Sequence, residues 1–165
     1  TDGQIFLETT LFNSGIKPAI NTGLSVSRVG GAAQKNIIKK LGGSTRITLA
    51  QFRELEAFSQ FSQDLDEETK KRLEQGKRTV ELMKQENQAP LSTAETACVL
   101  MVVQEDLFKD IPVTKVQEAE LELLTNLRTS HKDLLTAIEN NPVYEEYYID
   151  KLRAIIDDLM PVLSE

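Results

Sequence analysis

Tryptophan is absent from the sequence, cysteine and histidine each occur once, and aromatic residues make up only 5% of the 165 positions. The single cysteine, Cys98, cannot form an internal disulfide, and one cysteine with one histidine is too few for a zinc site. The scarcity of aromatic residues indicates a core of leucine, isoleucine, valine and alanine, which suits helices. The longest uncharged apolar run, residues 97–103, is far shorter than the ~20 residues that cross a bilayer. We therefore expect a globular protein without direct membrane insertion.

Charge is distributed unevenly along the chain, which has a net charge of -7. Residues 1–48 hold two acidic and six basic residues, whereas residues 49–165 hold 24 acidic and 13 basic residues. An acidic chain is a poor nucleic-acid binder, because neutralising phosphates requires a concentrated basic face. We expect no nucleic-acid partner, although the basic amino-terminal region could meet an acidic partner or a nucleotide.

Seven of the eight glycines lie in residues 3–43, and this composition boundary divides the chain. Before it, residues 2–8 and 23–29 alternate apolar and polar side chains, which predicts short strands. Residues 12–21 contain turn-forming residues and Pro18, which disfavour a regular central strand or helix. Two or three strand fragments cannot form a stable sheet alone. Residues 1–31 are therefore expected to be the end of a larger folded unit.

From residue 32 onward the apolar residues recur with a helical period. A short helix is predicted over Ala32–Leu41, ended by Gly42-Gly43. A second helix follows, with one broad apolar face formed by Leu49, Phe52, Leu55, Phe58 and Phe61. Residues 64–85 begin with acids and end with bases, as the helix dipole favours. Their apolar side is expected to contain Leu73, Val80 and Met83.

Two capping boxes are predicted in the second half of the chain. Ser92 and Glu95 form the first, before a segment that is apolar nearly all round and should be a central buried helix ended by Ile111-Pro112. Thr114 to Gln117 forms the second. It opens a stripe made of Val116, Leu123, Leu127, Leu134 and Ile138. After a break at Asn140–Pro142, a last helix is indicated by Leu152, Ile155, Ile156, Leu159 and Leu163. The predicted fold class is mainly α, a bundle of about six helices over residues 32–165.

Catalytic and metal-binding patterns are not found. Cys98 lies in the most apolar helix, so a buried thiol is favoured over a nucleophile. His131 lies on the stripe between Leu127 and Leu134, which favours a packed or half-exposed side chain. The acids of residues 64–68 lack EF-hand spacing, and no GxxxxGK[ST] phosphate-binding loop occurs. We expect no metal site and no enzyme that is complete within this chain.

Arg28 is the exception in an otherwise uncharged stretch, "NTGLSVSRVGGAAQ". Only it and Lys17 carry charge between Thr10 and Gln34. A rigid guanidinium flanked by small residues could serve as an arginine finger toward a phosphate held by a neighbouring subunit. The alternative is a structural salt bridge to Asp2 or Glu8, and spacing alone favours this alternative because isolated arginines are common.

Two stretches resemble the alpha subunit of F-type ATP synthases. They are "TDGQIFLETTLFNSGIKPAINTGLSVSRVGGAAQ" and "LAQFRELEAFSQFSQDLDEETKKRLEQGKRTVELMKQ", residues 1–34 and 49–85. From residue 86 onward the likeness is one of helical pattern and length. The resemblance implies that residues 1–31 are the terminal part of an α/β nucleotide-binding domain. Residues 32–165 would then be the carboxy-terminal helical domain.

The family's function follows as an implication of this resemblance. Its alpha subunits are non-catalytic and alternate with beta subunits in a ring of six around a rotating central shaft, the gamma subunit. The complex is peripheral to an energy-transducing membrane and couples ATP synthesis to proton transport. By match to "SVSRVG", Arg28 corresponds to the arginine that completes the beta catalytic site, and Ser25 to a serine needed for activity. Val26 would lie near the interface with beta.

The resemblance also implies a nucleotide site on the full subunit, which would bind ATP and Mg without turnover. Lys17 and Pro18 stand where the family has its adenine-contacting "RP", with lysine in place of arginine. Gln85 to Asn87 match a turn that closes over adenine, with asparagine at 87 where the family often has glutamine. Because the phosphate-binding loop is absent, no cofactor is expected for these 165 residues alone. No "DELSEED" string occurs, and residues 102–113 occupy its place, so a scaffold that frames the shaft is favoured over a lever.

Two other interpretations remain open. The chain could be a free-standing helical protein-interaction module derived from such a subunit. It could also belong to the alpha-like subunit of an ATPase that serves export or movement.

Overall fold

The structure, a computed structural model, describes residues 2–59 and 65–163. Within these ranges it has eight α-helices, one 3-10 helix and two very short strands. The helices are α1 Thr9–Asn13, α2 Arg28–Ala33, α3 Asn36–Ser59, α4 Glu67–Leu82, α5 Thr93–Gln104, α6 Val116–Thr129, α7 Lys132–Asn140 and α8 Glu146–Leu163. The 3-10 helix η1 covers Val113–Lys115, and the strands are β1 Gly3–Gln4 and β2 Val26–Ser27.

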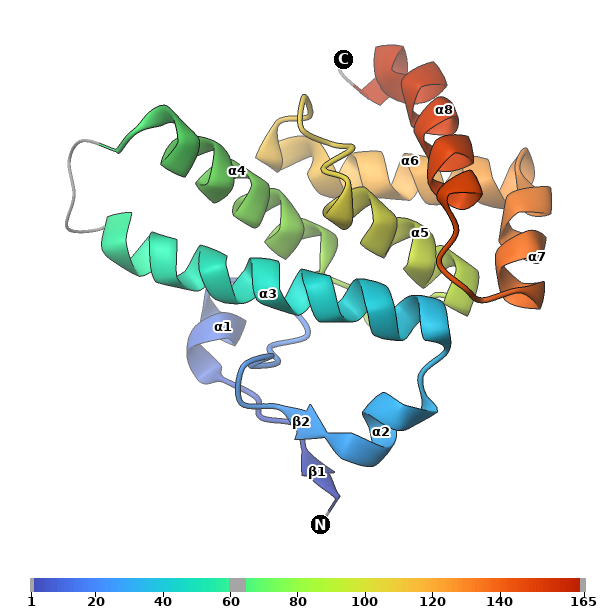
Figure 1. Cartoon of the computed structure of the whole chain (residues 1–165). Helices are drawn as coiled ribbons and strands as arrows, with labels where there is room; N and C mark the ends of the chain where they lie inside the picture. The colour runs from blue at the N-terminus through green and yellow to red at the C-terminus, as the bar shows by residue number, and fades with distance from the viewer. Residues whose placement is uncertain (1, 60–64, 164–165) are drawn as a thin grey trace.

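The six helices α3 to α8 form one packed bundle, which confirms the predicted mainly α fold. Their number equals the six predicted, but α3 joins two predicted helices and one predicted stripe is divided between α6 and α7. In Figure 1, α3 and α4 run side by side, and α5 and α6 lie on the far side of this pair. Helix α7 packs against α5 and α6, and helix α8 packs against α6 and α7. The amino-terminal elements β1, β2, α1 and α2 lie together outside the bundle, along one side of α3. No helix in the described ranges is long and apolar enough to cross a membrane.

Helix α5 is the centre of the bundle, as its apolar sequence predicts. Its side chains from Ala97 to Val103 are all buried. Its start has the predicted capping box, in which Ser92 Oγ accepts from the Glu95 backbone N–H and Glu95 accepts from the Ser92 backbone N–H. Glu95 also pairs with Arg128 of α6, with 2.5 Å between Oε1 and Nε. Burial opposes the charged form of Glu95, but these hydrogen bonds outweigh it and lower its pKa.

The predicted helix end at Gly42-Gly43 is wrong, because α3 runs through both glycines. Glycine in a helix interior costs about 1 kcal/mol relative to alanine. Burying a leucine or isoleucine side chain contributes about 1.5–3 kcal/mol. One face of α3 buries Ile37 and Leu41 before the glycines and Leu49 and Phe52 after them. Packing on both sides therefore outweighs the local preference to stop.

The apolar face of α3 is shorter than predicted. Leu49 and Phe52 are buried and Leu55 is half-buried, but Phe58 is 60% exposed. The middle of α3 packs against both α4 and α5, whereas its end has only α4 beside it (Figure 1). Phe61 lies outside the described residues.

Gly76 is the one glycine beyond residue 43, and it lets α4 approach α3 closely. A Cβ added there would lie 2.6 Å from the Cβ of Phe52 and closer still to its ring. On the same helix Leu73 is buried and Val80 and Met83 are half-buried, which agrees with the predicted apolar side. Asp66 caps the start of α4 by accepting from the Thr69 backbone N–H at 2.7 Å.

Helix α5 ends at Gln104, earlier than the predicted stop at Ile111-Pro112. Asp106 adopts a left-handed φ of 46°. Two backbone bonds then close the helix end, from Leu107 N–H to the Val102 carbonyl at 3.0 Å and from Asp106 N–H to the Val103 carbonyl at 3.4 Å. The chain turns back, and Phe108 and Ile111 enter the core. The segment 105–111, which was expected to continue the helix, is therefore a turn that buries only the side chains of Phe108 and Ile111.

The second predicted capping box is not formed. Residues Val113–Lys115 make the 3-10 helix η1, and Lys115 precedes α6 without a side-chain cap. Pro112 begins this turn, and its carbonyl accepts from the Lys115 backbone N–H at 2.9 Å. The predicted stripe is buried throughout, but it is shared by α6 and α7. On α8, Leu152, Ile155 and Ile156 are buried as predicted, and Leu159 is half-buried. The side chain of Leu163 lies outside the described residues.

The amino-terminal strands are shorter than predicted. β1 and β2 form an antiparallel ladder of two residues each, and a single bridge joins Leu7 to Ile20. Helix α1 lies between the two strands in the sequence, in a region where strands and turns were expected. Few apolar side chains are covered here. More than half of the surface is exposed for Ile5, Leu7, Phe12, Leu24, Val26 and Val29. Two short strands have too few neighbours to lengthen their ladder or bury these side chains.

Candidate functional site

Arg28 is the first residue of helix α2. The prediction that it belongs to a strand is therefore wrong. Ser27 is the residue before the helix, and its Oγ accepts from the Gly30 backbone N–H at 2.8 Å. A serine in this position satisfies one of the free N–H groups at a helix start, which is why the strand ends and the helix begins here. Arg28 is exposed. Its side chain therefore leaves the chain at a strand-to-helix junction with a defined backbone.

The alternative of a structural salt bridge for Arg28 is not supported. Asp2 accepts instead from the Val29 backbone N–H at 3.3 Å, and Glu8 accepts from the side-chain amide of Asn21. Across residues 2–59 and 65–163, Arg28 forms no ion pair. Within these ranges, then, no carboxylate neutralises the Arg28 guanidinium.

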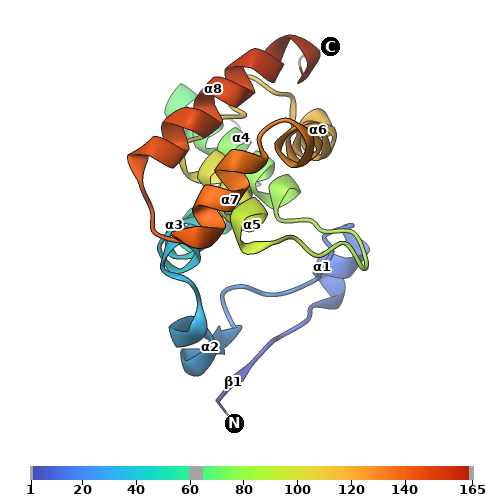
Figure 2. The same ribbon diagram turned by 90° about the vertical axis from the view of Figure 1, so that its right-hand side faces the viewer.

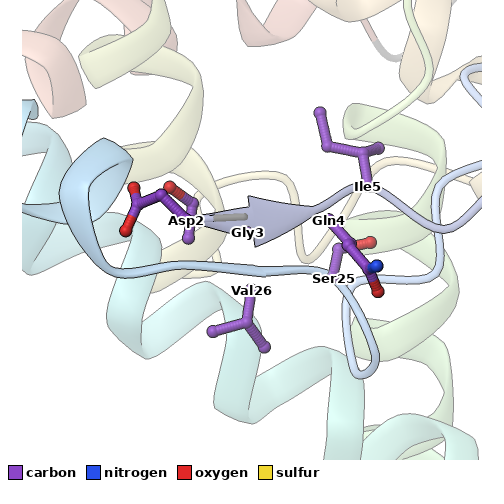
Figure 3. A pocket seen from close by; sticks show the side chains of 7 residues that line it. Asp2, Gly3, Gln4, Ile5, Ser25 and Val26 are labelled. Atoms are coloured by element: carbon purple, nitrogen blue, oxygen red, sulfur yellow. The ribbon is translucent and has the colours of Figure 1, made fainter.

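Ser25 ties the segment before Arg28 to the first strand. Its Oγ accepts from the Phe6 backbone N–H at 3.0 Å, and its own N–H donates to the Asn21 carbonyl at 3.0 Å. Val26 is 56% exposed and pairs with Gln4 across the ladder. A hollow of about 440 Å³ is lined by Asp2, Gly3, Gln4, Ile5, Ser25, Val26 and Ser27. Figure 3 shows Asp2 at one end of this hollow and Ser25 at the other, with the two strands between them.

The candidate adenine residues come from two distant parts of the sequence, and the fold joins them. The Gln85 backbone N–H donates to the Lys17 carbonyl at 2.9 Å. The Gln85 side chain closes its own loop by donating to the Ala89 carbonyl at 2.9 Å. Asn87 lies two residues farther along this exposed loop. Figure 2 shows the loop between α4 and α5 reaching α1.

The two groups of candidate residues are separate. In both ribbon views α1, which precedes Lys17 and Pro18, lies away from α2, which begins at Arg28 (Figures 1 and 2). Lys17 and Pro18 adopt a cis peptide bond, and the Lys17 ammonium lies 5.0 Å from the centre of the Phe12 ring. One surface thus presents a cation at a strand-to-helix junction, and another presents a closed loop beside a lysine.

The single cysteine and the single histidine do not form a reaction centre with other groups of the described residues. Burial raises the pKa of the Cys98 thiol to about 12, which keeps it protonated and unreactive. His131 is half-buried just before α7 and provides no side-chain cap. In the described part of the chain no cluster of histidine, cysteine or carboxylate side chains could hold a metal ion.

Two residues missed by sequence reasoning contact the Arg28 segment, namely Arg46 and Arg53 of α3. Arg46 donates to two backbone carbonyls of the loop before β2, and Arg53 donates to the side chain of Asn21. In the sequence both are ordinary charged positions on the polar side of a helix. No sequence signal could have identified them, because their partners are loop backbone and a side chain placed by the fold.

Comparison with known proteins adds an independent finding. Residues 34–159 match the family described as "ATP synthase alpha/beta chain, C terminal domain". The chain is 53% identical over 158 residues to "ATP synthase subunit alpha 2" of Legionella pneumophila (strain Corby), covering 96% of this chain and 31% of that protein. It is 54% identical over 158 residues to "ATP synthase subunit alpha" of Ruthia magnifica subsp. Calyptogena magnifica, with the same coverage.

A third relative, "ATP synthase subunit alpha" of Chromohalobacter salexigens, is 57% identical over 146 residues, which are 88% of this chain and 28% of the relative. The chain thus spans about a third of the length of the relatives it matches. A family match over most of the chain agrees with the helical bundle seen in the structure and with the resemblance in its motifs. The chain belongs to the family of the ATP synthase alpha/beta chain carboxy-terminal domain.

Proposed function

We propose that the chain is the carboxy-terminal part of a non-catalytic, regulatory ATP synthase alpha subunit, and that it supplies Arg28 to the catalytic site of a neighbouring beta subunit. The observation that carries this proposal is the state of Arg28. It is exposed at the start of α2 and forms no ion pair within the described residues, while the backbone beneath it is held by Ser27 and Asp2.

The chemistry of the guanidinium suits this role. Its planar fork of N–H donors can bind two oxygens of one phosphate at once, and it stays charged at every physiological pH. Charge spreads over the equatorial oxygens as a γ-phosphoryl group is transferred, and a cation placed there in trans lowers the barrier. A shorter lysine offers a point charge without the fork, so Arg28→Lys is a demanding test.

Ser25 and Val26 have supporting roles in this proposal. Ser25 joins the Arg28 segment to β1 through the Phe6 N–H, which makes its contribution one of placement. Val26 presents an exposed apolar side chain two residues before Arg28, where a beta subunit would pack. The exposed apolar side chains around β1 and β2 would likewise be covered by protein in the assembled complex.

The assembly follows from the same proposal. Alpha and beta subunits would alternate in a hexamer around a gamma shaft, peripheral to an energy-transducing membrane that carries the proton gradient. The helical bundle would frame the shaft, with the acidic turn after α5 toward it. The full subunit would bind ATP and Mg, with adenine near Lys17, Pro18, Gln85 and Asn87. For the 165 residues alone we propose no nucleotide binding in the low micromolar range, which isothermal titration can measure.

The experiment that tests the role of Arg28 uses the assembled complex of full-length alpha with beta and gamma. Arg28→Lys should lower steady-state ATP hydrolysis at saturating ATP by about 10³-fold or more, the range known for arginine fingers. The matched control is Arg72→Lys, because Arg72 lies on the exposed side of α4 and its one ion pair among the described residues is with Glu68. Turnover within twofold of wild type for Arg28→Lys, in a correctly assembled complex, would refute the proposal.

A further inference from the structure

The loop that leads to Arg28 is bound to the outer side of helix α3 by Arg46. One guanidinium nitrogen of Arg46, Nη2, lies 3.3 Å from the Gly23 carbonyl oxygen and 3.3 Å from the Ser25 carbonyl oxygen. Ser25 is the residue before β2, and β2 leads directly into Arg28. A single side chain therefore contacts the backbone three residues from the proposed phosphate-binding arginine.

Arg53 holds the start of the same loop. It lies about two helical turns after Arg46, so both side chains project from one face of α3. Its Nη1 lies 3.4 Å from Asn21 Oδ1. That oxygen also accepts from the backbone N–H groups of Gly23 and Leu24, each at 2.9 Å. The loop from Asn21 to Ser25 is thus fastened to α3 at both ends.

Helix α3 is itself a fixed reference for this attachment. Its opposite face is buried in the bundle through Ile37, Leu41 and Phe52. At its start the Ile37 N–H donates to the Pro142 carbonyl at 2.9 Å, which joins α3 to the segment before α8. A movement of the Arg28 segment relative to the bundle would therefore have to break the Arg46 contacts.

The other attachments of the Arg28 segment are few. They are the two-residue ladder with β1, the bond from Phe6 to Ser25, and the bond from Val29 to Asp2. All three lead to residues 2–6, which are exposed and belong to no helix. Arg46 alone joins the backbone just before β2 to a helix of the bundle by a hydrogen bond in the described ranges.

We propose that Arg46 is a positioning residue for Arg28, with Arg53 supporting it at the far end of the loop. This inference rests on the proposed role of Arg28 in phosphoryl transfer. Arg46 makes no contact with nucleotide in this scheme and acts by fixing the backbone from which Arg28 projects. Misplacing a catalytic group by about 1 Å can cost about 100-fold in rate. Loss of the two carbonyl contacts is therefore expected to lower the catalytic rate and leave nucleotide affinity unchanged.

The test compares Arg46→Ala, Arg46→Lys and Arg72→Ala in the assembled complex. Arg46→Ala should lower kcat by about 10- to 100-fold with KM for ATP within twofold of wild type. Arg46→Lys keeps a cationic donor on a shorter side chain, so its kcat should lie between those of Arg46→Ala and the wild type. Arg72→Ala removes the same charged group from an exposed site and should leave kcat unchanged.

Two further measurements distinguish a positioning role of Arg46 from a general loss of structure in the Arg46→Ala variant. Backbone amide exchange in residues 23–30 should quicken in Arg46→Ala, while exchange in α5 stays at the wild-type rate. In the Arg28→Lys background, Arg46→Ala should change the residual turnover by less than twofold, because there is no longer a guanidinium to position.

The outcomes distinguish the two proposals. If Arg28→Lys abolishes turnover but Arg46→Ala keeps wild-type kcat, the role of Arg46 is refuted and that of Arg28 stands. If Arg28→Lys keeps wild-type turnover, both fail. If the two substitutions multiply in effect, or if Arg46→Lys is as impaired as Arg46→Ala while exchange in residues 23–30 is unchanged, Arg46 acts elsewhere and the inference is overturned.

Discussion

A substitution of glycine by alanine should have opposite effects on stability at Gly76 and at Gly43. Both residues lie inside helices, so alanine lowers the conformational entropy of the unfolded chain equally in each case. Their surroundings differ. Nothing lies within 4 Å of a Cβ added at Gly43, whereas a Cβ added at Gly76 would meet the Phe52 Cβ at 2.6 Å. Ordinary contact between such atoms requires about 3.5–4.0 Å.

The size of the effect at Gly76 follows from what must move. Rotation of the Phe52 ring cannot relieve the clash, because the Cβ of Phe52 is fixed to the backbone of α3. Helices α3 and α4 would have to separate by about 1 Å, and overpacking of this kind costs about 1–3 kcal/mol. The higher helix propensity of alanine offsets at most about 1 kcal/mol of this cost. We expect Gly76→Ala to lose about 1–2 kcal/mol and Gly43→Ala to gain about 0.5–1 kcal/mol.

Thermal unfolding followed by circular dichroism measures both changes. Gly76→Ala should lower Tm by about 2–8 °C, and Gly43→Ala should raise it. A Phe52→Ala background removes the ring contacts but keeps the Cβ contact at 2.6 Å, so Gly76→Ala should still be destabilising there, by less than in the wild-type chain. If Gly76→Ala stabilises the wild-type chain as much as Gly43→Ala does, the close approach of α3 and α4 is refuted.

Two other predictions concern buried titratable groups. Burial raises the pKa of the Glu120 carboxyl from 4.5 to about 7. The folded protein therefore binds this proton more tightly than the unfolded chain, and stability falls as the pH rises through that interval. Glu120→Gln should gain about 1–3 kcal/mol at pH 8, with the gain absent near pH 4.5, as Tm at the two pH values will show. Because burial raises the pKa of Cys98 to about 12, a thiol reagent at pH 8 should label it only after denaturant unfolds the chain. Rapid labelling of the native chain would contradict the packing of α5.

Features that depend on near neighbours in the chain were predictable. The capping box of Ser92 and Glu95 involves residues one helical turn apart, so its geometry is nearly independent of the rest of the fold. The all-round apolar character of α5 could only be satisfied at the centre of a bundle. The buried positions of α6, α7 and α8 follow from the helical period in the same way.

Features that depend on competition between local preference and packing were not predictable. Gly42-Gly43 favours a helix end, yet residues on either side bury one continuous face of α3. The apolar residues after Gln104 suit a longer helix, yet Asp106 adopts a left-handed φ and returns Phe108 to the core. In each case the decisive energy comes from residues on other helices, which a periodic pattern does not include.

For the candidate site, too, some features follow from contiguous residues and others depend on packing. The motif around Arg28 determined by itself which arginine to examine and which family the chain resembles, because that information lies in contiguous residues. Tertiary structure alone decided that Arg28 starts a helix, that Asp2 and Glu8 bind other groups, and that the Gln85 backbone meets Lys17. It also placed Arg46 and Arg53 against the loop before Arg28. These contacts join residues far apart in the chain, and only the packing of α3 and the α4–α5 loop brings their donors and acceptors within hydrogen-bond distance.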